Sequence, residues 1–165
     1  HEVDHVRFGP AGALALEIEW NNKDPFFDRD LENFQRLHAI SAISVGVVVT
    51  RGASMQEELL PRVTAWMEGR GLAREEDLEA LGLSERTRAQ RRAVAGQVAR
   101  GIPFAQAFAK TFVASKFGQS TTHWSKLAER VSRGVGNPCP LLLLGLPAPV
   151  LTDETPVDPV PDLFG

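Results

Sequence analysis

The sequence predicts an α/β protein, with a central mixed β-sheet flanked by helices and a helical insertion. Three stretches of the 165 residues carry this prediction. Residues 13–20 alternate in polarity with period two, as the two faces of a strand do. Residues 44–50 are β-branched and almost uniformly apolar, which is typical of a strand covered on both faces. Residues 25–41, between them, show the apolar spacing of a helix.

The N-terminal part is expected to contain two strands joined by a tight turn. Residues 2–8 resemble a short strand, and the Gly-Pro-Ala-Gly connection at residues 9–12 suits a turn to the strand at 13–20. We expect that second strand to bury the face with its large apolar side chains, which are Leu14, Leu16, Ile18 and Trp20. The chain opens at His1 without an initiator methionine, so an upstream segment of the native protein is expected to be missing.

The helix at residues 25–41 begins with Asp24 as a cap and Pro25 in the first turn. A mainly helical segment over residues 72–133 is expected later in the chain, with Ser84 as one cap and Pro103 as another first-turn proline. After the predicted strand at residues 44–50, helices are expected at residues 55–68, 74–81, 84–100, 103–116 and 122–133.

The C-terminal part supplies one more strand and then a tail. Residues 141–146 form an apolar run that predicts a final buried strand. Residues 147–165 are rich in proline and aspartate and are expected to be extended or disordered. The predicted organisation is therefore a single core over residues 1–146 followed by this tail.

Composition excludes several classes of protein. No apolar run approaches the roughly 20 residues that a membrane helix needs, so no membrane partner is expected. Cys139 is the single cysteine, which excludes an intramolecular disulfide and argues against a cysteine zinc site. These features fit a protein of the reducing bacterial or archaeal cytoplasm.

The net charge of -3 hides a strong separation of charge along the chain. Residues 1–83 hold 8 Lys/Arg and 15 Asp/Glu, whereas residues 84–133 hold 10 and 2. Such a division is expected where one region gathers carboxylates for a metal and another faces phosphates. It is equally expected if helices simply sort their solvated charges in this way.

The glutamates of the second strand are the most informative candidates for chemistry. Glu17 and Glu19 lie two residues apart, so their side chains emerge on the same side, about 7 Å apart. Carboxylates held together repel unless a cation or proton lies between them, and oxygen ligands suit Mg²⁺. Asp4, on the neighbouring strand, is a third candidate. The alternative is a solvent-exposed polar face, but Asn21, Asn22 and Lys23 follow at the strand's end, where α/β sites usually lie.

Candidate DNA contacts lie on either side of the helical segment. The amides of Asn21 and Asn22 suit adenine, and Asn22 is the stronger candidate because Asn21 is equally explained as a strand terminator. Arg51, directly after the predicted strand at residues 44–50, is also assigned to DNA contact. A polar cluster at an expected helix start can supply one cap and further contacts to phosphates or bases, and it consists of Ser120, Thr121, Thr122 and His123.

Two further charged groups have ordinary explanations. Four arginines crowd one helical stretch, either as a solvated face or as a phosphate clamp, and they are Arg86, Arg88, Arg91 and Arg92. Three acids lie in the first turns of the helix at residues 25–41, where the helix dipole favours negative charge, and they are left out of the site: Asp28, Asp30 and Glu32.

Two sequence blocks resemble a known family. These are His-Glu-Val-Asp-His-Val at residues 1–6 and Ala-Leu-Glu-Ile-Glu-Trp-Asn-Asn-Lys-Asp-Pro-Phe-Phe-Asp-Arg-Asp-Leu at residues 15–31. They look like the BglII/BstYI group of type II restriction endonucleases, within the PD-(D/E)XK nuclease superfamily. The resemblance also includes residues 43–51, 118–123 and 139–146, roughly half of the chain.

The resemblance implies a restriction-endonuclease-like core and a magnesium site. Asp4 would be the first metal-binding acid and Glu17 the second, with the carbonyl of Ile18 as a further ligand. Glu19 stands where most of the superfamily has lysine, which leaves the identity of the general base open. Lys23 is suited either to stabilising the transition state or to transferring a proton.

The implied activity is Mg²⁺-dependent hydrolysis of double-stranded DNA within a restriction-modification system. Water oriented by Glu19 would attack phosphorus in line and expel the 3′ oxygen, which leaves a 5′ phosphate. A palindromic site, with GATC at its centre, implies a homodimer in which each subunit cuts one strand. The alternatives are a structure-directed repair or recombination nuclease and a non-catalytic dimeric DNA-binding module with vestigial acids.

Overall fold

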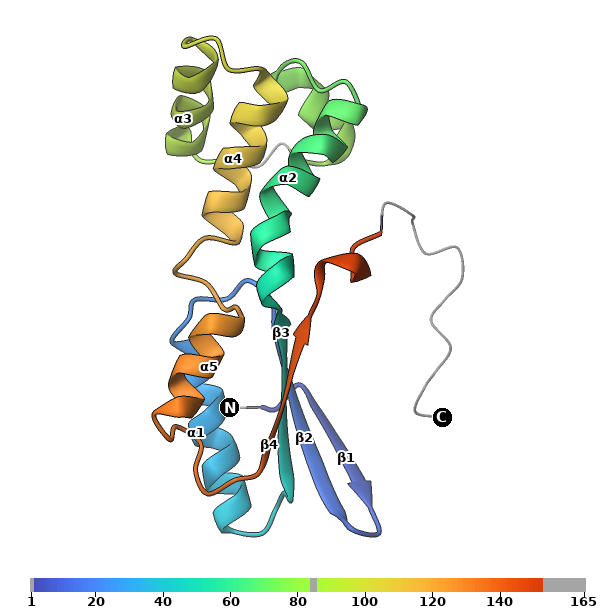
Figure 1. Ribbon diagram of the computed structural model, residues 1–165, viewed down its shortest axis with the longest axis vertical. Coiled ribbons are helices and arrows are strands. Elements are labelled where there is room, and N and C mark those ends of the chain that lie inside the picture. Colours follow the sequence, from blue (N-terminus) through green and yellow to red (C-terminus); the bar gives the residue numbers. More distant parts are fainter. Residues whose placement is uncertain (1, 84–85, 153–165) are drawn as a thin grey trace.

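A four-stranded mixed sheet forms the centre of the computed structural model, which describes residues 2–83 and 86–152 (Figure 1). The strands lie side by side in chain order as β1 (His5–Gly9), β2 (Gly12–Glu19), β3 (Val45–Arg51) and β4 (Leu141–Leu146). β1 pairs antiparallel with β2, whereas β2, β3 and β4 run parallel to one another. The predicted α/β class and all four predicted strands are confirmed.

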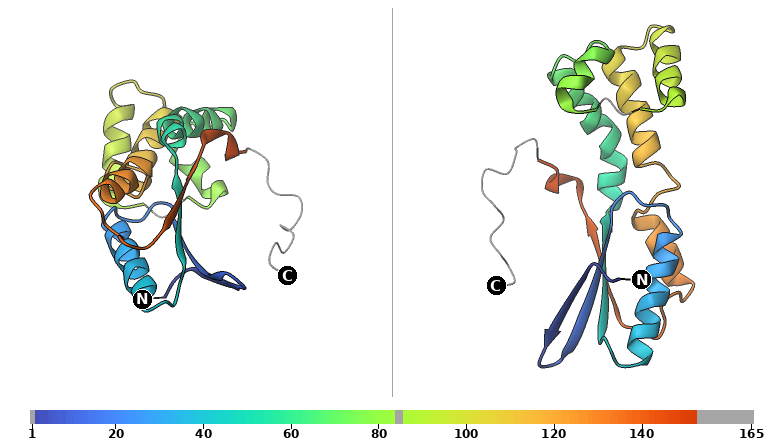
Figure 2. Two further views of the ribbon diagram at one scale, coloured as in Figure 1. Left: turned by 60° about the horizontal axis from the view of Figure 1, so that its bottom comes forward. Right: turned by 180° about the vertical axis from the view of Figure 1, so that it is seen from behind.

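Two helices cover one face of this sheet, α1 (Phe26–Ala39) and α5 (Trp124–Ser132) (Figures 1 and 2). The large side chains Phe27, Leu31 and Phe34 of α1 are fully buried there. The sheet makes room for them with small residues, because a Cβ atom added at Gly46 would lie 2.4 Å from the Phe34 ring. The main hydrophobic core therefore lies between α1 and a sheet face of small side chains.

The orientation of β2 corrects the sequence prediction. Its buried face carries the alanines and glutamates, and the face with the large apolar residues is open, with Leu14 43% and Ile18 45% exposed. Strand β4 is likewise half exposed, with Leu142 at 50%. Leucines facing α1 would occupy the space that its phenylalanines need, so the smaller residues of β2 take the helix side.

A helical lobe extends from the end of the sheet at which β3 finishes (Figure 1). Gly52 makes this connection, and its backbone lies so close to β4 that an added Cβ would be 2.8 Å from the Leu146 carbonyl oxygen. The lobe has a hydrophobic cluster of its own around Met67, Leu78 and Phe108. Its elements are α2 (Ala53–Gly69), the 3-10 helix η1 (Glu75–Leu81), α3 (Arg88–Val98) and α4 (Phe104–Lys116).

Several predicted boundaries differ from the observed ones. Helix α3 begins later than expected, because Thr87 caps it by accepting from the backbone N–H of Gln90, and Ser84 lies outside the described residues. Residues 148–150 form a short 3-10 helix, η2 (Ala148–Val150), in which Ala148 is buried and its N–H donates to Ser54 Oγ. The predicted tail therefore begins after an ordered turn, and residues 153–165 lie outside the described residues. Within the described ranges, every helix is too short or too polar to span a bilayer.

Candidate active site

The first two candidate acids lie on neighbouring strands. Asp4 immediately precedes β1, and the antiparallel register that pairs His5 with Leu16 carries Asp4 next to Glu17. The Asp4 carboxylate accepts a hydrogen bond of 2.9 Å from the backbone N–H of Ile18. The structure thus brings Asp4 and Glu17 together at the end of β2 that faces the helical lobe.

Glu17 and Glu19 do not form a solvent-exposed polar face. Each is only 2% exposed, on the side of β2 that packs against α1. Removing carboxylates from water is costly unless protons, cations or hydrogen bonds compensate. Burying them therefore costs folding free energy, and the packing of an ordinary strand does not explain why they are buried.

Helix α1 adds a fourth acid, Asp30, which the sequence analysis left out. Asp30 is fully buried, hydrogen-bonds with Glu19 and places its charge near Glu17. The missed signal is the spacing of Asp30 with the buried apolar stripe of α1, which occupies positions 27, 31 and 34. We call Asp4, Glu17, Glu19 and Asp30 the acid cluster.

The two glutamates of the acid cluster hold protons more tightly than isolated carboxylates do. Burial raises the pKa of Glu17 to about 7, and the negative charges of Asp30 and Asp4 act in the same direction. Burial also raises the pKa of Glu19 to about 7, against the opposing effect of the hydrogen bond from Asn22. Near neutral pH both groups can change protonation state, and a cation bound between them would displace their protons.

Glu19 is held at both of its carboxylate oxygens. Asn22 Nδ2 donates to Oε2 over 2.9 Å, and Arg29 Nη2 lies 3.6 Å from Oε1. Arg29 also binds Asp30, because the Arg29 Nε and Nη2 atoms lie 2.9 and 2.8 Å from Asp30 Oδ1. The Arg29 side chain is 39% exposed, so it connects the buried acids with solvent. Asn22, predicted to read a base, uses one amide N–H for Glu19 in this structure.

The donor set fits Mg²⁺. Within residues 2–83 and 86–152, no group of three or more His, Cys, Asp or Glu side chains is arranged to hold a metal ion. Magnesium does not need one, because it commonly binds one or two carboxylates and completes its shell with water and substrate phosphate. Asp4 and Glu17 supply two such carboxylates from adjacent strands, and the Ile18 carbonyl lies beside them in the chain.

Asn21 and Lys23 lie beyond the acid cluster, in the turn after β2. Both residues are exposed, and the backbone of Lys23 forms an isolated antiparallel bridge with Thr121. The contacts that hold the Glu19 carboxylate come from Asn22 and Arg29 and not from the Lys23 ammonium. Their predicted roles, in base contact and in catalysis, stay predictions.

Arg51, which the sequence assigned to DNA contact, is a framework residue in this structure. It is fully buried, and burial lowers the pKa of its guanidinium to about 10, so it stays charged at neutral pH. All of its nitrogens donate within the protein, and the acceptors are the carbonyl oxygens of Trp20, Phe117 and Thr122 together with the side chains of Gln56 and Thr121. Arg51 therefore ties the end of β2 to α2 and to the segment before α5, and it is not free to meet a phosphate.

The polar cluster at residues 120–123 is also mostly buried. Thr121, Thr122 and His123 are each at most 3% exposed, whereas Ser120 is exposed. None of the hydroxyl groups caps α5, because His123 occupies the N-cap position without a capping side-chain bond. Ser120 is thus the member of this cluster that can reach DNA without rearrangement, and the other three belong to the framework around Arg51.

Comparison with known proteins identifies the family. A protein-family model described as restriction endonuclease BglII/BglIII matches residues 1–146, which include all four strands and the acid cluster. No curated protein and no solved structure matches the chain. The family binds DNA, generally with a divalent metal, and the mixed sheet with flanking helices agrees with its fold. The chain therefore belongs to the BglII/BglIII family of restriction endonucleases, which are type II site-specific deoxyribonucleases.

Proposed function

We propose that this enzyme uses Mg²⁺ to hydrolyse both strands of duplex DNA at a palindromic site, with GATC at its centre, and leaves 5′ phosphates. The observation that carries the proposal is the placement of the exposed Asp4 next to Glu17, which is buried together with Glu19 and Asp30. Ionised carboxylates that are buried lower the stability of a fold, and groups with such raised pKa values are concentrated in active sites. The family match supports the reaction class.

Asp4, Glu17 and the carbonyl of Ile18 would hold the metal. When bound there, Mg²⁺ neutralises charge on the scissile phosphate and makes a water molecule more acidic. Glu19 orients that water, and its pKa of about 7 suits a general base that works near neutral pH. The contacts from Asn22 and Arg29 keep the Glu19 carboxylate in one orientation.

Cationic side chains near the acid cluster would stabilise negative charge on the scissile phosphate. The guanidinium of Arg29 is partly exposed beside Glu19, where it can stabilise the charge that develops on the phosphoryl oxygens. Lys23 is a second candidate for that task. As water attacks phosphorus in line, the bond to the 3′ oxygen breaks, and the leaving oxygen takes up a proton from solvent.

The exposed polar residues near the site would contact DNA. Asn21, Asn22 and Ser120 present side chains to solvent near the end of β2, and we assign base or phosphate contacts to them. A palindrome read by a two-fold assembly requires two copies of this chain, so the active form is a homodimer in which each subunit cuts one strand.

Digestion of a sequenced plasmid tests the proposal. With Mg²⁺ we expect discrete fragments, whose ends a ligase rejoins without prior phosphorylation, and we expect no cleavage after chelation of the metal. Glu17→Ala should abolish cleavage and keep the circular dichroism spectrum of the wild type. Sequence-independent or junction-dependent cutting would indicate a repair or recombination nuclease instead. Metal-independent DNA binding without any cleavage would indicate a binding module.

A further inference from the structure

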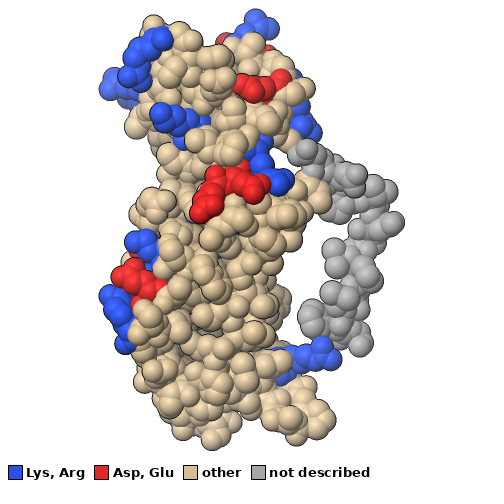
Figure 3. All heavy atoms as spheres, in the orientation of Figure 1, with Lys and Arg blue, Asp and Glu red and all other residues tan. Residues whose placement is uncertain are grey.

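The outer helices of the lobe carry cations without acids. Residues 88–116, which include α3 and α4, contain no Asp or Glu. All of their cationic side chains are exposed, and these are Arg88, Arg91, Arg92, Arg100, Lys110 and Lys116. In Figure 3, blue atoms gather at the upper left of the molecule, where Figure 1 shows α3. We call Arg88, Arg91 and Arg92, which lie closest together in sequence, the cationic face of α3.

Helix stability does not explain this cationic face. The three arginines lie in the first two turns of α3, where the helix dipole disfavours positive charge, and no acid balances them there. Arg88 and Arg92 are also four residues apart, a spacing at which like charges repel on a helix. Arg91 lies 3.4 Å from Glu75, but Arg88 and Arg92 have no ion pair within the described part of the chain. The cations therefore lower the stability of α3 slightly and remain available to a partner.

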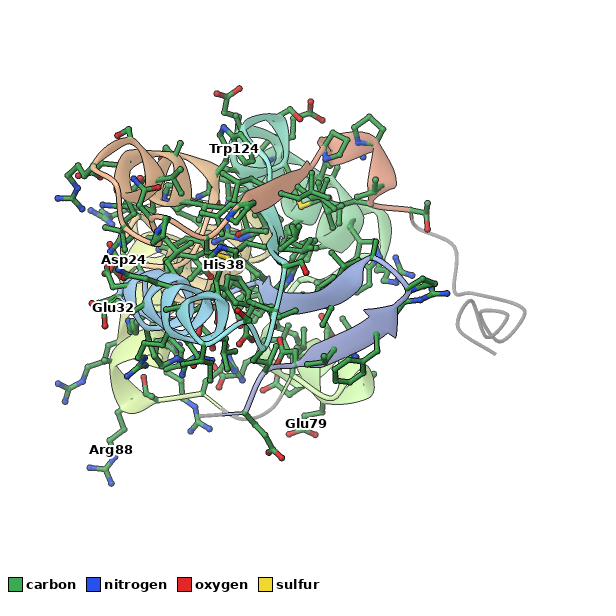
Figure 4. The ribbon with its side chains drawn as sticks, turned by 90° about the horizontal axis from the view of Figure 1, so that it is seen from below. Asp24, Glu32, His38, Glu79, Arg88 and Trp124 are labelled. Atoms are coloured by element: carbon green, nitrogen blue, oxygen red, sulfur yellow. The ribbon has the colours of Figure 1, made fainter. Side chains whose placement is uncertain are left out.

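The geometry of α3 presents these cations outward. Val94 and Gln97 are its buried residues, and by helical spacing Arg88 and Arg92 lie on the opposite side, about 6 Å apart along the axis. Alanines occupy the next positions along the same side, at residues 95 and 99, so nothing bulky shields the arginines. Figure 4 shows Arg88 pointing away from the ribbon. The cationic face is therefore open to a large, rigid polyanion.

The cationic face also lies on the side of the molecule that carries the active site. Figures 1 and 2 agree that α3 is on the same side of the sheet as α1 and α5. Glu17 and Glu19 point to that same side of β2. Helix α2 has 17 residues, so the lobe extends about 25 Å beyond the sheet, which corresponds to about seven base pairs of duplex.

We propose that the cationic face of α3 binds backbone phosphates of duplex DNA that flanks the cleavage site. The contact supplies affinity and orientation, not sequence recognition, because phosphates are the same at every base pair. The proposal rests on the proposed function in taking duplex DNA as the ligand, but it does not depend on cleavage.

Binding of a mixed-sequence duplex in the presence of chelator tests this contact. The double variant Arg88→Gln, Arg92→Gln should weaken binding about 10-fold or more near 0.1 M salt, and lower the slope of log K against log salt by about 2. The matched control is Arg62→Gln, Arg133→Gln, which removes the same charge from exposed arginines that pair with Glu58 and Glu129. The control should bind like the wild type. Arg88→Lys with Arg92→Lys should restore most of the affinity, because phosphate contact depends mainly on charge.

Three results would overturn the proposal. They are unchanged binding by the glutamine pair, an equal loss in the control, and a loss in the lysine pair as large as in the glutamine pair. Since no metal is present, the result is independent of catalysis. An inactive enzyme that still binds DNA through α3 would contradict the proposed function alone, and a cleaving enzyme with unaffected glutamine variants would contradict this inference alone.

Discussion

The acid cluster and the cationic face of α3 differ in the sign of their charges and in their exposure to water. Three of the acids, Glu17, Glu19 and Asp30, are buried between β2 and α1, where burial and the neighbouring negative charges raise the pKa of Glu17. The arginines are exposed at the far end of the molecule, where water screens their repulsion. Each arrangement works against local stability, and each is explained by a ligand of opposite charge, a cation in one place and phosphates in the other. If both proposals hold, chemistry and affinity lie in separate regions, which the sequence already separates into an acidic and a basic segment.

The largest effect is expected from Glu17→Gln, which removes a proposed metal ligand and keeps the shape of the side chain. Loss of outer residues around a metal typically lowers activity about 10–100-fold, so loss of a direct ligand should exceed that range. Plasmid cleavage measures the effect. The same variant should also melt at a higher temperature than the wild type at pH 8 without metal, because it removes a repulsive buried charge.

Duplex binding measured in the presence of chelator separates the effects of variants in the acid cluster from those of variants in the cationic face of α3. Glu17→Gln should bind DNA as well as the wild type or better, whereas the α3 variants should bind worse but retain cleavage at saturating enzyme. A Glu17→Gln enzyme that cuts normally would break the assignment of the acid cluster to chemistry.

A smaller effect is expected from Arg29→Gln. Arg29 positions Glu19 through a contact of 3.6 Å and lowers the pKa of that carboxyl, so its loss should reduce kcat about 10-fold and move the acidic limb of the pH–rate profile to higher pH. Arg36→Gln, an exposed arginine on the same helix, is the matched control and should leave both unchanged. An unchanged kcat together with an unshifted profile in Arg29→Gln would leave Arg29 with a purely structural role.

Much of the fold could be predicted from local pattern. Alternation, β-branched runs and helix caps located the strands and most helices, because these signals depend on neighbouring residues only. The choice of face on β2 could not be predicted in this way. Alternation shows that the two faces differ, but the large residues of α1 decide which one is buried, and this packing brings Ala15 and Leu31 into the same core cluster.

The site shows the same division between local and tertiary information. Glu17 and Glu19 stand out in sequence because they lie two residues apart on one strand, and Asp4 is a third candidate because the neighbouring strand was expected to include it. Asp30 was assigned to the helix dipole, which was a sufficient local explanation, and only the packing of α1 brings it to the glutamates. Arg51 was assigned to DNA contact from the sequence, yet five protein acceptors surround its guanidinium in the fold.

The smallest effect concerns stability against pH. The pKa values of Glu17 and Glu19 rise from 4.5 in the unfolded chain to about 7 in the folded protein. A raised pKa contributes stability that is present at low pH and is lost as pH rises through the folded value. The metal-free wild type should therefore lose several degrees of Tm between about pH 5 and 8, at about 2–4 °C per kcal/mol. The Tm of Glu17→Gln should fall clearly less over the same pH range. Parallel curves of Tm against pH for the two proteins would show that the buried charge of Glu17 does not destabilise the fold.

Calorimetric titration of Ca²⁺ into the enzyme bound to duplex DNA tests most directly whether Asp4 and Glu17 share one cation. The wild type should bind the ion saturably and release protons at pH 7, seen as a heat that depends on the ionisation enthalpy of the buffer. Asp4→Asn and Glu17→Gln should each lose that binding while the duplex stays bound. Unchanged ion affinity in both variants would contradict the metal site and the mechanism built on it.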